Sequence, residues 1–123
     1  MAEANPQQRS GQLLSFAPSG PLPPRTAPYV SFDRRELGVI LNLYGKKVAE
    51  GEWRDYAMDM LKDRALFSVY KRASERPLYV IEKNPKLRNR QGQYMVVAQD
   101  GRVVKRGHEL STVLRVLELA LVR

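Results

Sequence analysis

LFSVYKRASERPLYVIEKNPKLRNRQGQYMVVAQDGRVVKR, residues Leu66–Arg106, is the stretch of sequence that decides the fold. Several runs within it alternate apolar and polar residues, which is the pattern of half-buried β-strands. Asp100-Gly101 predicts a two-residue hairpin turn, because the central residues of such turns favour a positive φ. The stretch therefore predicts an antiparallel meander whose strands are Leu66–Arg72, Pro77–Lys83, Tyr94–Gln99 and Arg102–Arg106.

The same part of the chain holds almost all of the net charge. Ala65–Gly107 contains ten Lys and Arg residues against three acidic ones, a balance of +7 in a chain whose formal net charge is +8. The densest cluster is KNPKLRNRQG, residues Lys83–Gly92, which connects two predicted strands. A basic surface of this kind favours acidic partners such as nucleic acid or anionic lipid.

A helix is predicted before the meander. Asp33-Arg34-Arg35-Glu36 has the form of a capping box, in which the Asp33 side chain and the Glu36 side chain each accept a backbone N–H of the other residue. The residues that follow are apolar at helical spacing, so they predict one buried face. That face consists of Leu37, Ile40, Leu41, Tyr44 and Val48.

A second helix, Glu109–Val122, is predicted after the meander. Its apolar residues form a wide stripe, and a helix that is apolar on most sides is buried on most sides. In a short chain such a helix can lack cover, so a homodimer or another protein partner through this helix is one hypothesis. The other hypothesis is that the first helix and the N-terminal arm cover this stripe. The stripe is Leu110, Val113, Leu114, Leu117 and Leu121, widened by Val116, Leu119, Ala120 and Val122.

The segment Glu52–Arg64 fits two patterns. Trp53, Tyr56, Ala57, Met60 and Leu61 have helical spacing, whereas Tyr56, Met58 and Met60 alternate as in a strand. The segment is short for a stable helix, so both alternatives stay open. The sequence predicts an α+β fold with a helix on each side of a four- or five-stranded antiparallel sheet.

Residues 1–30 form a Pro-rich arm that we expect to be disordered, and residues 31–123 a single small domain. Six of the eight prolines lie in the arm, and such a composition offers little apolar surface to bury. Pro21–Arg25, PLPPR, is either a polyproline ligand or part of a plain tether. Leu13, Leu14 and Phe16 can dock on the domain, although nothing in the sequence fixes this.

Several blocks, quoted in order, resemble a known family: FDRRELGVILNLYGKKVAEGEWRDYA, RALFSVYKRASERPLY, KLRNRQGQY and KRGHEL. The family consists of small basic proteins, found mainly in alphaproteobacteria, that contain a domain of unknown function. The resemblance extends from about Phe32 to Leu117. It implies a bacterial cytoplasmic protein and carries over no catalytic or binding residue.

The composition argues against an enzyme and against a resident cofactor. The chain has no cysteine and a single histidine, His108, whereas a typical zinc site needs three or four ligands. His108 beside Glu109 suggests acid–base chemistry, but no nucleophile motif accompanies it. No run approaches the length of a membrane span, and the first residues do not form a signal peptide. We expect a soluble cytoplasmic protein with no metal site and no membrane contact.

The best functional hypothesis is a non-catalytic module that binds RNA or DNA through the basic loop. Lysine, arginine and asparagine side chains donate hydrogen bonds to phosphates, and tyrosines on the flanking strands can stack on unpaired bases. A solvated loop with no partner remains the alternative, because charge clusters are weak evidence. The candidate nucleic-acid-binding residues are Lys83, Lys86, Arg88, Arg90, Lys105, Arg106, Tyr79 and Tyr94.

Overall fold

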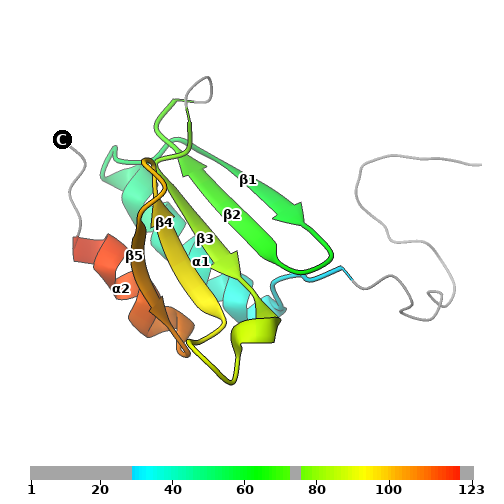
Figure 1. Ribbon diagram of the computed structural model, residues 1–123. Coiled ribbons are helices and arrows are strands. Elements are labelled where there is room, and N and C mark those ends of the chain that lie inside the picture. Colours follow the sequence, from blue (N-terminus) through cyan, green and yellow to red (C-terminus); the bar gives the residue numbers. More distant parts are fainter. Residues whose placement is uncertain (1–28, 73–75, 120–123) are drawn as a thin grey trace, which may run out of the picture.

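The computed structural model describes residues 29–72 and 76–119 (Figure 1). The predicted arm lies outside the described residues except for Tyr29 and Val30. In chain order the elements are helix α1 (Arg34–Ala49), strands β1 (Asp55–Met60), β2 (Ala65–Tyr70) and β3 (Tyr79–Lys83), the short 3-10 helix η1 (Pro85–Leu87), strands β4 (Tyr94–Ala98) and β5 (Val103–Gly107), and helix α2 (Leu110–Leu119).

The five strands form one antiparallel meander in the order β1-β2-β3-β4-β5, so the predicted α+β fold is confirmed. The ambiguous segment supplies β1, which pairs with β2 over its whole length, from Asp55 opposite Tyr70 to Met60 opposite Ala65. Asp100-Gly101 does lie in the β4–β5 turn, but the predicted two-residue loop is wrong. Ala98 N–H donates to Arg102 C=O at 2.8 Å and Gly101 N–H to Ala98 C=O at 2.9 Å, so the loop has three residues, with Gly101 at φ 88°.

Both helices lie on the same face of the sheet, so the prediction of one helix on each side is wrong. Figure 1 shows α1 and α2 together behind the strands. Phe67, Ile81 and Val96 occupy successive register positions on the covered face and are fully buried. They form one hydrophobic core with residues of both helices. The reason is that alternate strand residues supply only one continuous apolar face, and both amphipathic helices need it.

Helix α1 is rotated relative to the face that its sequence predicts. Its capping box is present as predicted, but the buried residues are Glu36, Ile40, Leu43 and Lys47, whereas Leu41 and Val48 are 42% and 41% exposed. Tyr44 is half-buried and packs on Tyr56 of β1 and Phe67 of β2, with ring centroids 5.0 and 6.2 Å away. Packing against α2 sets this rotation, because the neighbouring helix buries whichever side faces it.

Helix α2 buries the stripe that its sequence predicts. Leu110, Val113, Leu114 and Leu117 are at most 2% exposed and pack against β4, β5 and α1; Leu121 lies outside the described residues. The hypothesis of a homodimer through α2 therefore finds no exposed apolar stripe in the described part of this helix, where Leu119 is the exposed large apolar residue. In residues 29–72 and 76–119, no helix has the length and apolar character needed to cross a membrane.

Candidate nucleic-acid interface

The meander divides the basic residues between the two ends of the sheet. Successive connections of an antiparallel meander alternate between its ends, so the β2–β3 and β4–β5 connections lie at one end and the β3–β4 connection at the other (Figure 1). Lys71, Arg72, Arg76 and Arg102 therefore lie far from the Lys83–Gly92 loop. The net charge that is clustered in the sequence does not form a single surface in space.

The β3–β4 connection is an ordered turn that presents three cations. The Asn84 side chain accepts the Lys86 backbone N–H at 3.2 Å and so caps η1. Backbone N–H groups of Arg90 and Gly92 both donate to Leu87 C=O at 3.0 Å, which folds the end of the loop back on itself. Lys86, Arg88 and Arg90 are all exposed. The loop thus holds its cations on a fixed backbone and does not need to order them on binding.

Contact between two glycines places this loop beside the end of β5. Gly92 is buried with φ +100°, and a Cβ on it would lie 2.3 Å from the carbonyl carbon of Gly107. Lys105 and Arg106 precede Gly107 on β5; Lys105 is exposed and Arg106 is half-buried, opposite Met95. The structure therefore brings Arg106 to the same end as Lys86, Arg88 and Arg90. Lys105 lies one residue farther along β5, opposite Val96, and points to the other face of the sheet.

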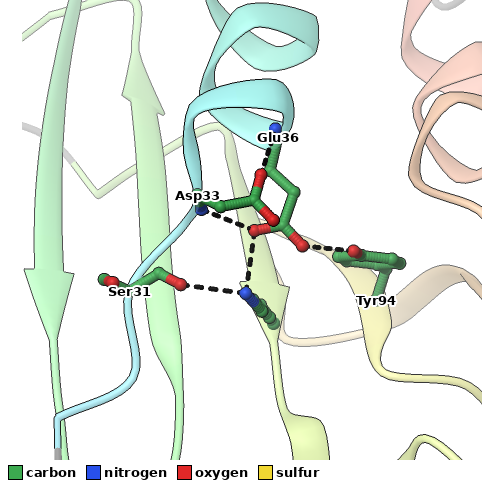
Figure 2. A network of polar contacts seen from close by, with 5 residues as sticks. Ser31, Asp33, Glu36 and Tyr94 are labelled. Carbon is green, nitrogen blue, oxygen red and sulfur yellow. Dashed lines mark hydrogen bonds and ion pairs between the residues drawn. The ribbon is translucent and has the colours of Figure 1, made fainter.

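Lys83 and Tyr94 instead form hydrogen bonds with the buried Glu36; Figure 2 labels Tyr94, Glu36, Asp33 and Ser31 of this network. Glu36 is 2% exposed, and its Oε1 accepts the Asp33 backbone N–H at 2.7 Å and Lys83 Nζ at 2.8 Å. The Tyr94 hydroxyl donates to Glu36 Oε2, and Lys83 Nζ also donates to Ser31 C=O at 2.9 Å. A buried carboxylate is stable only when its charge is paired and its oxygens are hydrogen-bonded. Lys83 and Tyr94 meet that need, so their polar groups are used inside the fold.

Neither candidate tyrosine offers its ring to a base at this end. Tyr94 is 3% exposed, and its ring packs in the core. Tyr79 begins β3, four residues before Lys83, so it lies roughly 13 Å away at the opposite end of the strand. Tyr79 is also half-buried against the core. The alternation of apolar and polar residues predicts that both tyrosines lie on the flanking strands. It does not predict that both side chains point to the helix-covered face of the sheet.

Two cations that the sequence reasoning missed lie at the same end. Arg34 and Arg35 are exposed in the first turn of α1, and the bond between Glu36 and Lys83, 47 residues apart, fixes that turn beside the end of β3. Arg35 is close enough to the Tyr94 phenol to lower its pKa, against the larger effects that raise it. No local signal connects α1 with the loop, because the connection runs through a tertiary ion pair.

A family model matches residues 30–114 and is described as "Protein of unknown function (DUF2794)". The chain belongs to this family. The matched region contains α1, all five strands and the first half of α2, which confirms the resemblance to a family of unknown function. No curated protein and no solved structure matches the chain. Membership in the family therefore assigns no activity to the chain.

The cations at this end are unpaired within the part of the chain that the structure describes. Here we define the basic end as Arg34, Arg35, Lys86, Arg88, Arg90, Lys105 and Arg106. None of these seven side chains forms an ion pair with a described residue, in contrast to Lys83 with Glu36 and Arg64 with Glu82. Unpaired cations on a fixed surface are available to an anionic partner.

His108 is exposed at the start of α2, next to the basic end. Within residues 29–72 and 76–119 no three His, Asp or Glu side chains are grouped as metal ligands would be.

The buried Tyr94 phenol makes alkaline stability a test of the network. Burial, followed by the hydrogen bond to Glu36, raises the pKa of Tyr94 well above its usual range. The stabilisation is therefore fully present below the unfolded-state pKa of about 10, and it is lost as the pH rises through the folded-state pKa. We expect the free energy of unfolding to fall above pH ~10, by up to about 1.4 kcal/mol per pH unit from this group.

Urea unfolding at pH 8 to 11 measures this effect against Tyr94→Phe. At pH 8 the variant should be less stable by roughly 1.5–3 kcal/mol, the contribution of a hydrogen bond to a charged group. The difference from wild type should shrink as the pH rises further, because phenylalanine has no proton to lose. If the free energies of unfolding of wild type and Tyr94→Phe differed by the same amount at every pH, the pKa of Tyr94 would not be raised.

Proposed function

We propose that this protein binds nucleic acid through its basic end and contacts phosphates without strong sequence preference. The observation that carries the proposal is the set of seven exposed or half-exposed cations, unpaired within the described residues, that three separate chain segments bring to one end of the sheet. Arginine and lysine in such clusters are the usual phosphate donors, and arginine adds bidentate hydrogen bonds.

The arrangement supports backbone contact more than base reading. Sequence is read by side chains that reach base edges or by aromatic rings that stack on unpaired bases. Tyr94 is buried and Tyr79 lies at the far end of β3, so the affinity rests on charge. We therefore expect duplexes, with their higher charge density, to bind at least as tightly as single strands of the same length.

The experiment is a fluorescence anisotropy titration of labelled single- and double-stranded RNA and DNA at two salt concentrations. Wild-type affinity should fall as a power of the salt concentration, with a slope of about −0.9 per phosphate contacted on duplex DNA. The triple variant Lys86→Ala, Arg88→Ala, Arg90→Ala should bind at least tenfold more weakly. Its salt slope should be smaller by roughly 2 to 3, because each lost phosphate contact releases about one counterion fewer.

A matched control separates the basic end from net charge alone. Arg54→Ala, Arg76→Ala, Arg102→Ala removes the same charge from exposed arginines at the opposite end of the sheet. This variant should keep the wild-type salt slope to within about one phosphate contact. If the two triple variants lost the same affinity, or if wild type did not bind at low salt, the loop would be only a solvated surface.

A further inference from the structure

Exposed large apolar side chains gather on α1 and β1, which meet through the Tyr44 and Tyr56 rings. Tyr56, Met58 and Met60 alternate along β1 and are 41%, 41% and 54% exposed. Their register partners Val69, Phe67 and Ala65 are fully buried on the helix-covered face, so these three side chains point to the same face. Leu41 and Val48 of α1 and Leu61 after β1 are also exposed. We call these six residues, Leu41, Val48, Tyr56, Met58, Met60 and Leu61, the β1 patch.

The patch borders a sheet edge that no strand of the described residues covers. β1 is one of the two outer strands, and an outer strand carries a row of backbone N–H and C=O groups that can pair with another strand. The other outer strand, β5, has a register irregularity opposite Val96 and Val97 and the cations Lys105 and Arg106, features that discourage pairing. β1 has a regular six-residue register without bulge, proline or lysine, and its two charged residues, Asp55 and Asp59, lie on the face away from the helices. Its geometry is therefore that of a site for strand addition.

The N-terminal arm is attached beside this edge. The Val30 backbone N–H donates to Leu61 C=O at 2.8 Å, directly after β1, and Lys83 holds Ser31 C=O. Phe16 lies fourteen residues before Val30, a length that spans up to about 46 Å when extended, against about 20 Å for β1. The arm can thus reach every residue of the β1 patch.

The arm also contains a segment that matches the patch chemically. Leu13-Leu14-Ser15-Phe16 is its only run with three large apolar side chains, and Arg9 lies four residues before it. In an extended strand Leu14 and Phe16 share one face, which matches the two-residue spacing of Tyr56, Met58 and Met60. Asp55 and Asp59 of β1 lie on the opposite face and favour a segment with a basic neighbour.

We propose that the arm segment Leu13–Phe16 docks along the edge of β1 and covers the β1 patch with Leu14 and Phe16. A second copy of the chain fits less well, because two antiparallel copies of β1 would bring four aspartates onto one face of the joined sheet. The tether also favours the arm, since an attached segment has an effective concentration in the millimolar range. This proposal is independent of the nucleic-acid-binding function.

Cysteine cross-linking tests the proposal in the full chain, which contains no natural cysteine. Ser15→Cys and Ala57→Cys place thiols on the face away from the patch, and neither removes an apolar contact. A short bifunctional maleimide should join them within one molecule at least tenfold faster than it joins Ser15→Cys and Val103→Cys. Val103 is the matched control, because it is 44% exposed and lies on β5 at the opposite edge.

Two further variants make the result decisive. Adding Leu14→Ser and Phe16→Ser to the Ser15→Cys, Ala57→Cys protein should slow cross-linking to the rate of the Val103 control, whereas a mere tether would be unaffected. An unchanged rate would overturn the proposal. Ala57→Cys alone reports on self-association: efficient cross-linking between molecules would assign the β1 edge to a second copy and also overturn docking of the arm.

Discussion

Replacing Glu36 with alanine is expected to lower the free energy of unfolding by about 3–5 kcal/mol, the usual result of removing one partner of a buried ion pair. Glu36 accepts from Lys83, Tyr94 and the Asp33 backbone N–H. Its loss removes half of the capping box and leaves the Lys83 ammonium, with a side chain only 14% exposed, without its counter-charge. A domain of this size has about 5–15 kcal/mol of stability in total.

Urea unfolding at neutral pH measures the effect, with Glu109→Ala as the control. Glu109 is an exposed acid, and its loss should change stability by no more than about 0.5 kcal/mol. If Glu36→Ala is too unstable to study, Glu36→Gln retains the shape of the side chain and the double-mutant cycle with Lys83→Met isolates the pair. A coupling energy near zero would show that the two groups do not stabilise each other.

The second large effect is expected at Gly92. Gly92→Ala should lower the free energy of unfolding by about 3–5 kcal/mol, the sum of backbone strain and overpacking. The φ of +100° disfavours any side chain, and a Cβ would overlap the Gly107 backbone at 2.3–2.8 Å. The atoms it meets are main-chain atoms, so no side-chain rotation can relieve the contact.

Gly101→Ala separates these two causes. Gly101 has a similar φ of +88°, but nothing lies within 4 Å of a Cβ built there. It should therefore lose only the conformational part, roughly 1–2 kcal/mol. Equal losses at the two glycines, measured by urea unfolding, would mean that the β3–β4 loop does not press on the end of β5. In that case the loop would also be free to move away from Lys105 and Arg106.

The sequence located part of the candidate site but not its composition. The cations of the β3–β4 loop were recognised from their density in the chain, and the structure leaves Lys86, Arg88 and Arg90 exposed. Lys83 looks the same in sequence, yet it is paired with Glu36. Charge is a property of the residue, whereas availability depends on neighbours that come from distant parts of the chain. For this reason the proposed site omits Lys83, Tyr79 and Tyr94 of the predicted set and includes Arg34 and Arg35.

Local signals determined the elements of this protein. The capping box of α1, the Asp100-Gly101 turn and the α2 stripe depend on residues within a few positions of one another, and all three are present. The conformation of Asp55–Met60 was decided only by tertiary structure, because its strand form needs β2 as a partner. The rotation of α1, the shared face of the two helices and the division of charge between the ends of the sheet have the same origin. Each depends on which surfaces of the sheet and the helices pack against each other. Such packing rests on contacts between residues 47 or 58 positions apart, and these contacts produce no periodic pattern in the sequence.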